Sequence, residues 1–189
     1  MKQLFFILIL LSIMSCKAQQ IIPLNTSAFR TPSNSYFKDL NNEFDQYVGT
    51  WTSSYQGKNI KLVINKELKV PFEMWDKFFF RDRLLVRYEL KDINGVILQS
   101  TLNKDFTNAG TLSIEGLITQ ENGNIVRLIF SGGNCSVGIG EIKFQKISAT
   151  QFSWSYYPGT TTRNDINCPP GLDYKIYLPE TENLVFTKQ

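Results

Sequence analysis

Residues 111–130 read TLSIEGLITQENGNIVRLIF, and this stretch decides the fold class. In residues 111–119 apolar and polar side chains alternate, which is the pattern of a strand with one buried face. Gly116 interrupts the alternation at a place where a bulge would fit. Residues 121–124 (ENGN) are turn formers, and a second strand follows over residues 125–130. The stretch therefore predicts two neighbouring antiparallel strands.

The same pattern recurs along the chain after Gly49. Asn94-Gly95, the strongest hairpin dipeptide of the chain, separates two of the expected strands. Short strands spaced in this way, without helical periodicity between them, predict an antiparallel barrel or sandwich in one domain, residues 35–189. The expected strands are residues 51–55, 60–64, 78–90, 95–102, 111–119, 125–130, 137–147, 152–157, 172–178 and 184–187.

One short helix is expected at the start of this domain, over residues 35–48. Its apolar side chains recur at steps of three and four, which is one face of an amphipathic helix. Ser35 is a suitable N-cap and Gly49 a suitable stop. The apolar positions are Phe37, Leu40, Phe44 and Val48.

Composition excludes several classes of function. The chain has 189 residues, of which 42% are hydrophobic and 13% aromatic, so it can bury a core and is not disordered. It contains no histidine, which excludes Ser-His-Asp catalysis and histidine-ligated metals. The formal net charge of +3 comes without a clustered basic stripe, so no nucleic-acid partner is expected.

The first residues look like a targeting signal. Lys2 precedes an apolar run over residues 4–11, which is about half of the ~20 residues that a membrane-spanning helix needs. A cationic start, a short apolar run and a small residue at the cut site are typical of a secretory signal peptide, here residues 1–15.

Ile13-Met14-Ser15-Cys16 resembles the lipobox of bacterial lipoproteins, in which the cysteine becomes the lipidated first residue. This resemblance implies acyl chains on Cys16 and a membrane anchor. The alternative is a secreted protein cut near Ala18. Polar residues and prolines make residues 16–34 an expected tether.

The resemblance also implies a compartment. Residues 17–20 lack the acidic residues of surface-export signals, which favours the periplasm-facing side of the outer membrane while leaving surface exposure open. If Cys16 carries lipid, Cys135 and Cys168 remain as a pair in an oxidising compartment, and we expect a disulfide between their two turn-like segments. A nucleophilic cysteine would need a neighbouring base or a Cys-x-x-Cys pair, and the chain has neither.

Gly49-Thr50-Trp51 on the first expected strand resembles the opening of the lipocalin (calycin) barrels. In that family the Trp seals one end of an up-and-down meander beneath a basic residue of the last strand, and Lys188 is placed for that role. The segment from Leu172 to Tyr177 is similar to the family's Thr-Asp-Tyr-x-x-Tyr, with Leu in place of Thr. The resemblance implies a lipocalin-like barrel; otherwise Trp51 is a core aromatic of another meander. The chain also resembles an uncharacterised family of small Bacteroidetes-type lipoproteins.

Three functional classes follow from this fold. A barrel can hold a small hydrophobic or amphipathic ligand, and the proposed mouth residues are Phe79, Arg81, Arg83 and Arg87. The alternation of a strand with one buried face would also place aromatic and charged residues in this order without any ligand, with the arginines facing solvent.

The second class is an enzyme, and we expect none because the acidic residues show no signature spacing. The third is an interaction module of the envelope, with a filled barrel and residues 158–165 as a binding loop. We expect a non-catalytic binding role without cofactor or metal.

Overall fold

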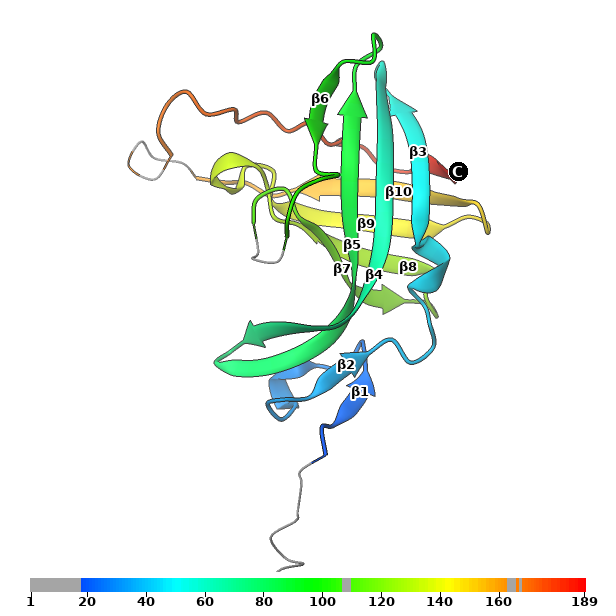
Figure 1. Ribbon diagram of the computed structural model, residues 1–189, viewed down its shortest axis with the longest axis vertical. Coiled ribbons are helices and arrows are strands. Elements are labelled where there is room, and N and C mark those ends of the chain that lie inside the picture. The colour runs from blue at the N-terminus through cyan, green and yellow to red at the C-terminus, as the bar shows by residue number, and fades with distance from the viewer. Residues whose placement is uncertain (1–17, 107–109, 163–165, 167) are drawn as a thin grey trace, which may run out of the picture.

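The computed structural model describes residues 18–106, 110–162, 166 and 168–189, and there it shows an all-β protein, as predicted (Figure 1). Its helical segments are the 3-10 turns η1 (Ala28–Arg30), η2 (Asp45–Tyr47) and η3 (Asn134–Ser136). The strands are β1 (Ile21–Pro23), β2 (Tyr36–Lys38), β3 (Gly49–Tyr55), β4 (Lys58–Met74), β5 (Lys77–Lys91), β6 (Ile97–Ser100), β7 (Ile114–Gln120), β8 (Ile125–Phe130), β9 (Gly140–Lys146), β10 (Gln151–Pro158) and β11 (Leu184–Lys188).

Eight of these strands close an antiparallel up-and-down barrel, which confirms the predicted fold class. Within the set β3, β4, β5 and β7 to β11, each strand pairs with the next, and β11 pairs back with β3. The closing register sets Lys188 opposite Trp51. β6 lies outside this circuit and pairs with β5, across the turn in which Gly95 N–H donates to Asp92 O at 3.0 Å.

Alternation of side chains builds the core. Leu62 and Ile64 of β4 are fully buried, whereas Lys61 between Leu62 and the buried Ile60 is exposed. The expected bulge in β7 is confirmed by a register shift between Gly116 and Ile118. These strands bury one face each against the other side of the barrel.

β4 and β5 run beyond the barrel as a long hairpin whose tip is the turn Trp75-Asp76. The sequence predicted β4 only to Ile64. Residues 65–74 do not alternate cleanly and include Pro71, which has no N–H to donate and therefore argues against a strand unless that position faces no partner. Pairing with β5 nevertheless continues to Met74.

The predicted tether is wrong from Ile21 onwards. β1 pairs in parallel with β2, and β2 pairs in parallel with β5 along the hairpin. Ile22 and Leu24 are 8% and 5% exposed. Burial of these two apolar side chains, together with the strand pairing, holds this otherwise polar segment on the hairpin.

The helix predicted over residues 35–48 is wrong as well. The segment starts as β2, and its helical part is the single turn η2. The Asp39 carboxylate accepts hydrogen bonds from the N–H groups of Glu43 (2.8 Å) and Phe44 (3.1 Å). Such local side-chain bonds replace the helical ladder with a turn. Leu40, expected on the apolar face, is 52% exposed.

Residues 172–178 form no strand, contrary to the prediction. Asp173 accepts hydrogen bonds from Lys175 N–H (2.9 Å) and from the Tyr177 hydroxyl (2.8 Å), and these bonds lower the pKa of Asp173. The aspartate thus holds a turn in place of an extended strand.

Candidate functional site

The interior of the barrel is filled with aromatic side chains. Phe152 is central, with ring centroids 4.4 Å from Phe144, 4.7 Å from Trp51 and 5.5 Å from Phe186. Trp154 lies 5.8 Å from Phe186. All five residues are at most 1% exposed. This packing favours the alternative in which the barrel holds no small ligand.

One end of the barrel is sealed around Trp51. Its indole N–H donates to Tyr47 O at 2.8 Å, and Lys188 Nζ lies 5.2 Å from the centre of its ring. This is the arrangement that the lipocalin resemblance implies. The Tyr47 hydroxyl donates to the carbonyl oxygens of Gly123 and Asn124, both at 2.9 Å, and burial raises the pKa of Tyr47.

The segment before β11 covers the opposite end. The Trp154 indole N–H reaches Pro179 O at 3.1 Å, and Tyr156 N–H donates to Thr181 O at 3.0 Å. The Tyr156 hydroxyl donates to Gly138 O, and Leu178 is 3% exposed. The described residues therefore close the barrel at both ends.

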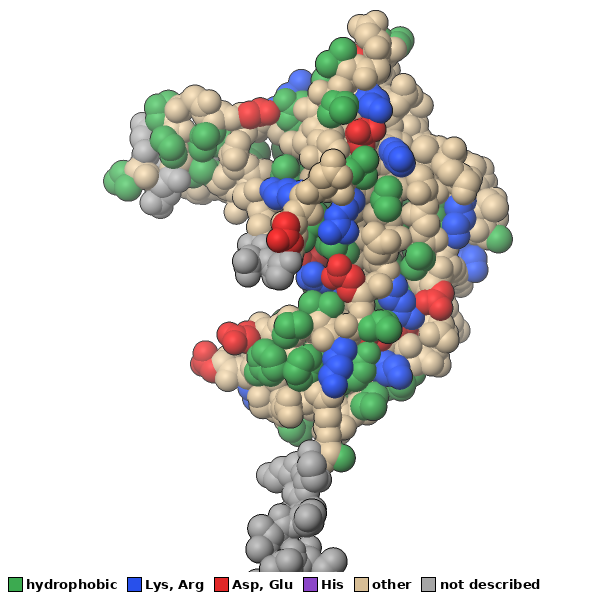
Figure 2. Space-filling model, in the orientation of Figure 1, with side chains coloured by type: hydrophobic (Ala, Val, Ile, Leu, Met, Phe, Trp, Pro, Cys, Tyr) green, Lys and Arg blue, Asp and Glu red, His purple; other side chains and the backbone are tan. Residues whose placement is uncertain are grey.

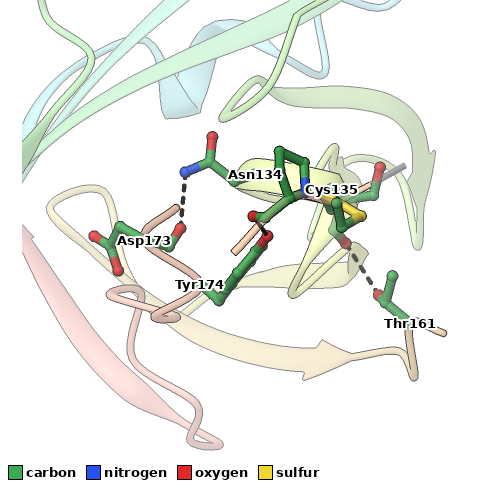
Figure 3. Close-up of a disulfide and its surroundings, with 8 residues drawn as sticks. Asn134, Cys135, Thr161, Asp173 and Tyr174 are labelled. Carbon is green, nitrogen blue, oxygen red and sulfur yellow. Dashed lines mark hydrogen bonds between the residues drawn. A yellow bond between two sulfur atoms is a disulfide. The ribbon is translucent and has the colours of Figure 1, made fainter. Parts of the chain in front are cut away.

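The predicted disulfide between Cys135 and Cys168 is confirmed, with the two Cα atoms 5.9 Å apart (Figure 3). Around it, Asn134 Nδ2 donates to Asp173 O at 2.8 Å. The Thr161 hydroxyl donates to Ser136 O at 3.1 Å, which connects the predicted binding loop to η3; residues 163–165 of that loop lie outside the described part. The disulfide thus joins η3 to the segment that covers the barrel.

The four residues proposed for a mouth lie along the hairpin and on β5, at neither end of the barrel. Phe79 is fully buried, with ring centroids 5.4 Å from Phe37 and 5.3 Å from Phe72. The Arg81 guanidinium lies 4.7 Å above the Phe72 ring and donates from Nη2 to Leu117 O at 3.1 Å. Its Nε is buried without a partner among the described residues, and burial lowers the pKa of Arg81 to about 10.

Arg83 and Arg87 also have partners within the chain. Arg83 pairs with Glu67 and with Glu115, both at 2.8 Å. The Arg87 guanidinium lies 5.6 Å from the centre of the Phe106 ring. Arg83 therefore joins β4, β5 and β7, and its charge is already neutralised by two carboxylates.

A cleft of about 550 Å³ separates the hairpin from the barrel wall, and Figure 2 shows the surface hollowed there. We call it the hairpin cleft. Four carboxylates face two guanidiniums in it, so its lining is acidic on balance. Its apolar lining includes Pro71, Phe72, Leu85 and Phe106, and its charged lining is Glu67, Glu73, Asp105, Glu115, Arg83 and Arg87.

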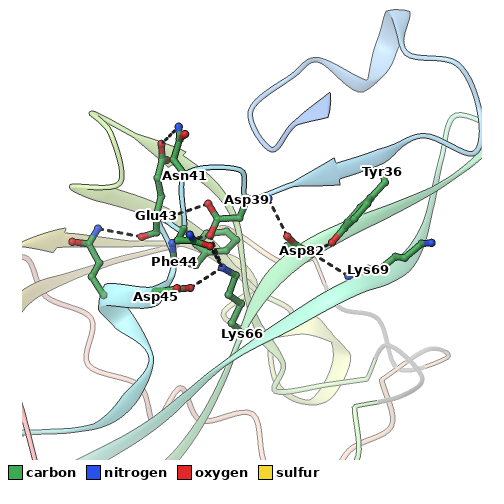
Figure 4. A network of polar contacts seen from close by, with 11 residues as sticks. Tyr36, Asp39, Asn41, Glu43, Phe44, Asp45, Lys66, Lys69 and Asp82 are labelled. Atoms are coloured by element: carbon green, nitrogen blue, oxygen red, sulfur yellow. Dashed lines mark hydrogen bonds and ion pairs between the residues drawn. The ribbon is translucent and has the colours of Figure 1, made fainter. Parts of the chain in front are cut away.

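A polar network attaches the N-terminal segment to the hairpin (Figure 4). The buried Asp82 carboxylate accepts hydrogen bonds from the Tyr36 hydroxyl and from the N–H groups of Asp39 and Lys69, the latter two at 3.0 Å. Burial and the bond to Asp82 raise the pKa of Tyr36. Sequence reasoning missed this network, because its members are brought together only by the pairing of β2 with β5.

Lys66 completes the attachment. Its Nζ lies 2.9 Å from Asp39 and 2.6 Å from Asp45, and the Asp39 side chain is 2% exposed. Burial alone would lower the pKa of Lys66, but hydrogen bonds to Asp45 and Asp39 raise it overall. The three groups are therefore all engaged in holding the fold.

Among the described residues, no three His, Cys, Asp or Glu side chains converge on a common metal position. In the same part of the chain, no helical segment has the length and apolarity needed to cross a bilayer. Cys16 and the expected signal peptide lie outside the described residues.

Comparison with known proteins places the chain in a family. A model described as "Family of unknown function (DUF6705)" matches residues 1–189, so the chain belongs to this family. No curated protein and no solved structure matches the chain significantly.

Proposed function

We propose that this member of the family is a lipid-anchored protein of the cell envelope with a non-catalytic binding role, and that it binds a partner protein in the hairpin cleft. The observation that carries the proposal is that the barrel interior is filled while the hairpin cleft on the outer surface is open. Because aromatic rings occupy the barrel, binding has to use the outer surface.

The cleft suits a polypeptide segment. Phe72 and Phe106 offer apolar contact, and the surplus of carboxylates favours a basic side chain next to an apolar one. Arg83 is less suited to an external anion, because Glu67 and Glu115 already bind it. The absence of histidine and the engagement of Asp82 and Lys66 in structural bonds support a role without catalysis.

The lipid anchor rests on Cys16 and the signal before it. The disulfide supports an oxidising compartment, such as the periplasm-facing side of the outer membrane. The test is to express the full chain in a bacterium with two membranes and to measure the intact mass of the membrane-bound form. We expect a chain that starts at Cys16 and carries acyl groups, whereas Cys16→Ala should yield no acylated product.

Binding is tested by a photo-reactive residue placed at Glu73, which lines the cleft, in cells of the native host. The matched control has the same residue at Ile93, which is 79% exposed at the far end of β5. A discrete cross-linked protein from position 73 alone would support the proposal. A small apolar molecule that co-purifies with the folded chain, without any cross-link, would favour the barrel-ligand alternative and overturn it.

A further inference from the structure

We infer that the tip of the β4–β5 hairpin inserts into the membrane surface beside the lipid anchor. This inference rests on the proposed acylation of Cys16. Its basis is a group of exposed apolar side chains at the hairpin tip, which we call the tip patch. The tip patch consists of Phe29 (68% exposed), Met74 (38%), Trp75 (61%) and Phe78 (40%).

The tip patch is held in place by defined contacts. The Phe29 and Trp75 rings meet edge-on with centroids 5.7 Å apart. Lys77 Nζ donates to Phe29 O at 3.2 Å, which fixes η1 against the turn. Trp75 has a φ of 50°, in a two-residue turn of the kind that usually contains Asn-Gly. A bulky side chain is strained there, and its exposed ring gains little packing in return.

The anchor cannot lie far from this patch. Tyr36 N–H donates to Gln20 O at 2.8 Å, and Phe80 N–H donates to Ser35 O at 3.0 Å. Two steps between neighbouring strands put Gln20 about 10 Å from β5. Cys16 is four residues before Gln20, a stretch of chain that spans at most about 14 Å. An acylated Cys16 therefore holds the hairpin close to the bilayer.

The charges near the patch point to apolar insertion and away from attraction to anionic lipids. Next to the patch, Arg30 of η1 and Lys77 are balanced by Glu73 and Asp76. Lys69 lies farther from the turn along β4, with its Nζ 5.4 Å from the centre of the Phe80 ring. Figure 2 shows hydrophobic side chains gathered on the lobe from which the N-terminal chain departs. Aromatic side chains are favoured at the boundary between lipid headgroups and acyl chains, so the occupant that fits the tip patch is a lipid surface.

Tryptophan fluorescence tests the inference. Of the three tryptophans, Trp51 and Trp154 are buried in the barrel, so quenching from the membrane reports on Trp75. The acylated full chain is reconstituted into phosphatidylcholine vesicles with brominated acyl chains. We expect a blue shift and loss of most of the Trp75 emission, independent of the anionic lipid content. The Trp75→Phe variant should show neither change.

The controls separate the inference from the proposed anchor. Sedimentation with the vesicles and the acylated mass report on the anchor alone. A chain that sediments, but whose emission is unaffected by brominated lipid, would overturn the inference and leave the anchor intact. Phe29→Ser should weaken the quenching, whereas Ile93→Ser, at the far end of β5, should leave it unchanged. Near-ultraviolet circular dichroism of the buried aromatic residues verifies that each variant is folded.

Discussion

Lys188 Nζ lies 5.2 Å from the centre of the Trp51 ring, directly across the seam where β11 meets β3. This seam is short, because its register comprises only Thr187 with Thr52 and Lys188 with Trp51. Gly49, with a φ of 131°, lies under the same lysine, and a Cβ there would come within 3.0 Å of Lys188 Cε. Side-chain contacts therefore supplement a weak stretch of backbone pairing at the closure of the barrel.

Loss of the cation at this seam should destabilise the barrel. Lys188→Met keeps an apolar stem but removes the cation–π contact, so we expect the free energy of unfolding to fall by about 1 kcal/mol. Lys188→Arg keeps the charge above the ring and should stay near the wild-type value. Urea unfolding followed by fluorescence measures both variants. Equal stability of the Met variant and the wild type would refute the role of the contact.

The two partly buried arginines of the hairpin should respond differently to substitution. Arg83→Met leaves the partly buried Glu67 and Glu115 without their shared cation, at a cost of about 1–2 kcal/mol. Arg81→Met removes a guanidinium whose Nε has no partner among the described residues, so its cost should be smaller. Thermal unfolding compares the two. A larger loss for Arg81→Met would show that its contact with Phe72 dominates.

Lys66 should be important for the attachment of the N-terminal segment. Lys66→Met leaves the buried Asp39 carboxylate without its cation and should lower the free energy of unfolding by about 3 kcal/mol. Lys61→Met, at an exposed position of the same strand, is the control and should change little. Chemical denaturation measures both.

The effect of Lys66 should also depend on pH. Its pKa is raised in the folded state, so its stabilising contribution is fully present below the ordinary value of 10.5 and is lost as pH rises through the folded-state value. The difference in stability between wild type and Lys66→Met should therefore shrink above about pH 10.5. A difference that stays constant through this range would contradict the assignment.

Removal of the disulfide should weaken the cover of the barrel without changing its strands. Cys135 and Cys168 are 33 residues apart, for which the chain-entropy model gives about 3–4 kcal/mol. The double variant Cys135→Ser/Cys168→Ser should melt lower than the oxidised wild type and become insensitive to reductant. Far-ultraviolet circular dichroism should show the same strand content. Identical melting of oxidised and reduced wild type would contradict this expectation.

Sequence patterns identified the barrel strands because each one buries a single face, which leaves a period of two in the chain. Residues 111–130 show this most clearly, and they became β7 and β8 with the bulge near Gly116. The disulfide was predicted because Cys135 and Cys168 are the two cysteines that remain when Cys16 carries lipid. Trp51 and Lys188 came from a resemblance, and the closing register of β3 and β11 puts them together.

Local patterns failed where distant segments decided the outcome. The spacing of Phe37 and Phe44 is that of a helix. The structure of this segment is instead determined by parallel pairing of β2 with β5 and by the hydrogen bonds that Asp39 accepts in the turn. Beyond Ile64, the apolar residues of the hairpin show no clear periodicity. β4 pairs there with β5, and β5 pairs with β2 of the N-terminal segment.

The sequence by itself determined an all-β chain, its approximate strands and its cysteine pair, because alternation and residue counts are local properties. Only the tertiary structure decided that aromatic rings fill the barrel, that a cleft opens beside the hairpin and that Trp75 is exposed near the N-terminal segment. Those features depend on which face of each strand meets another strand, and contacts between segments far apart in sequence leave no local pattern.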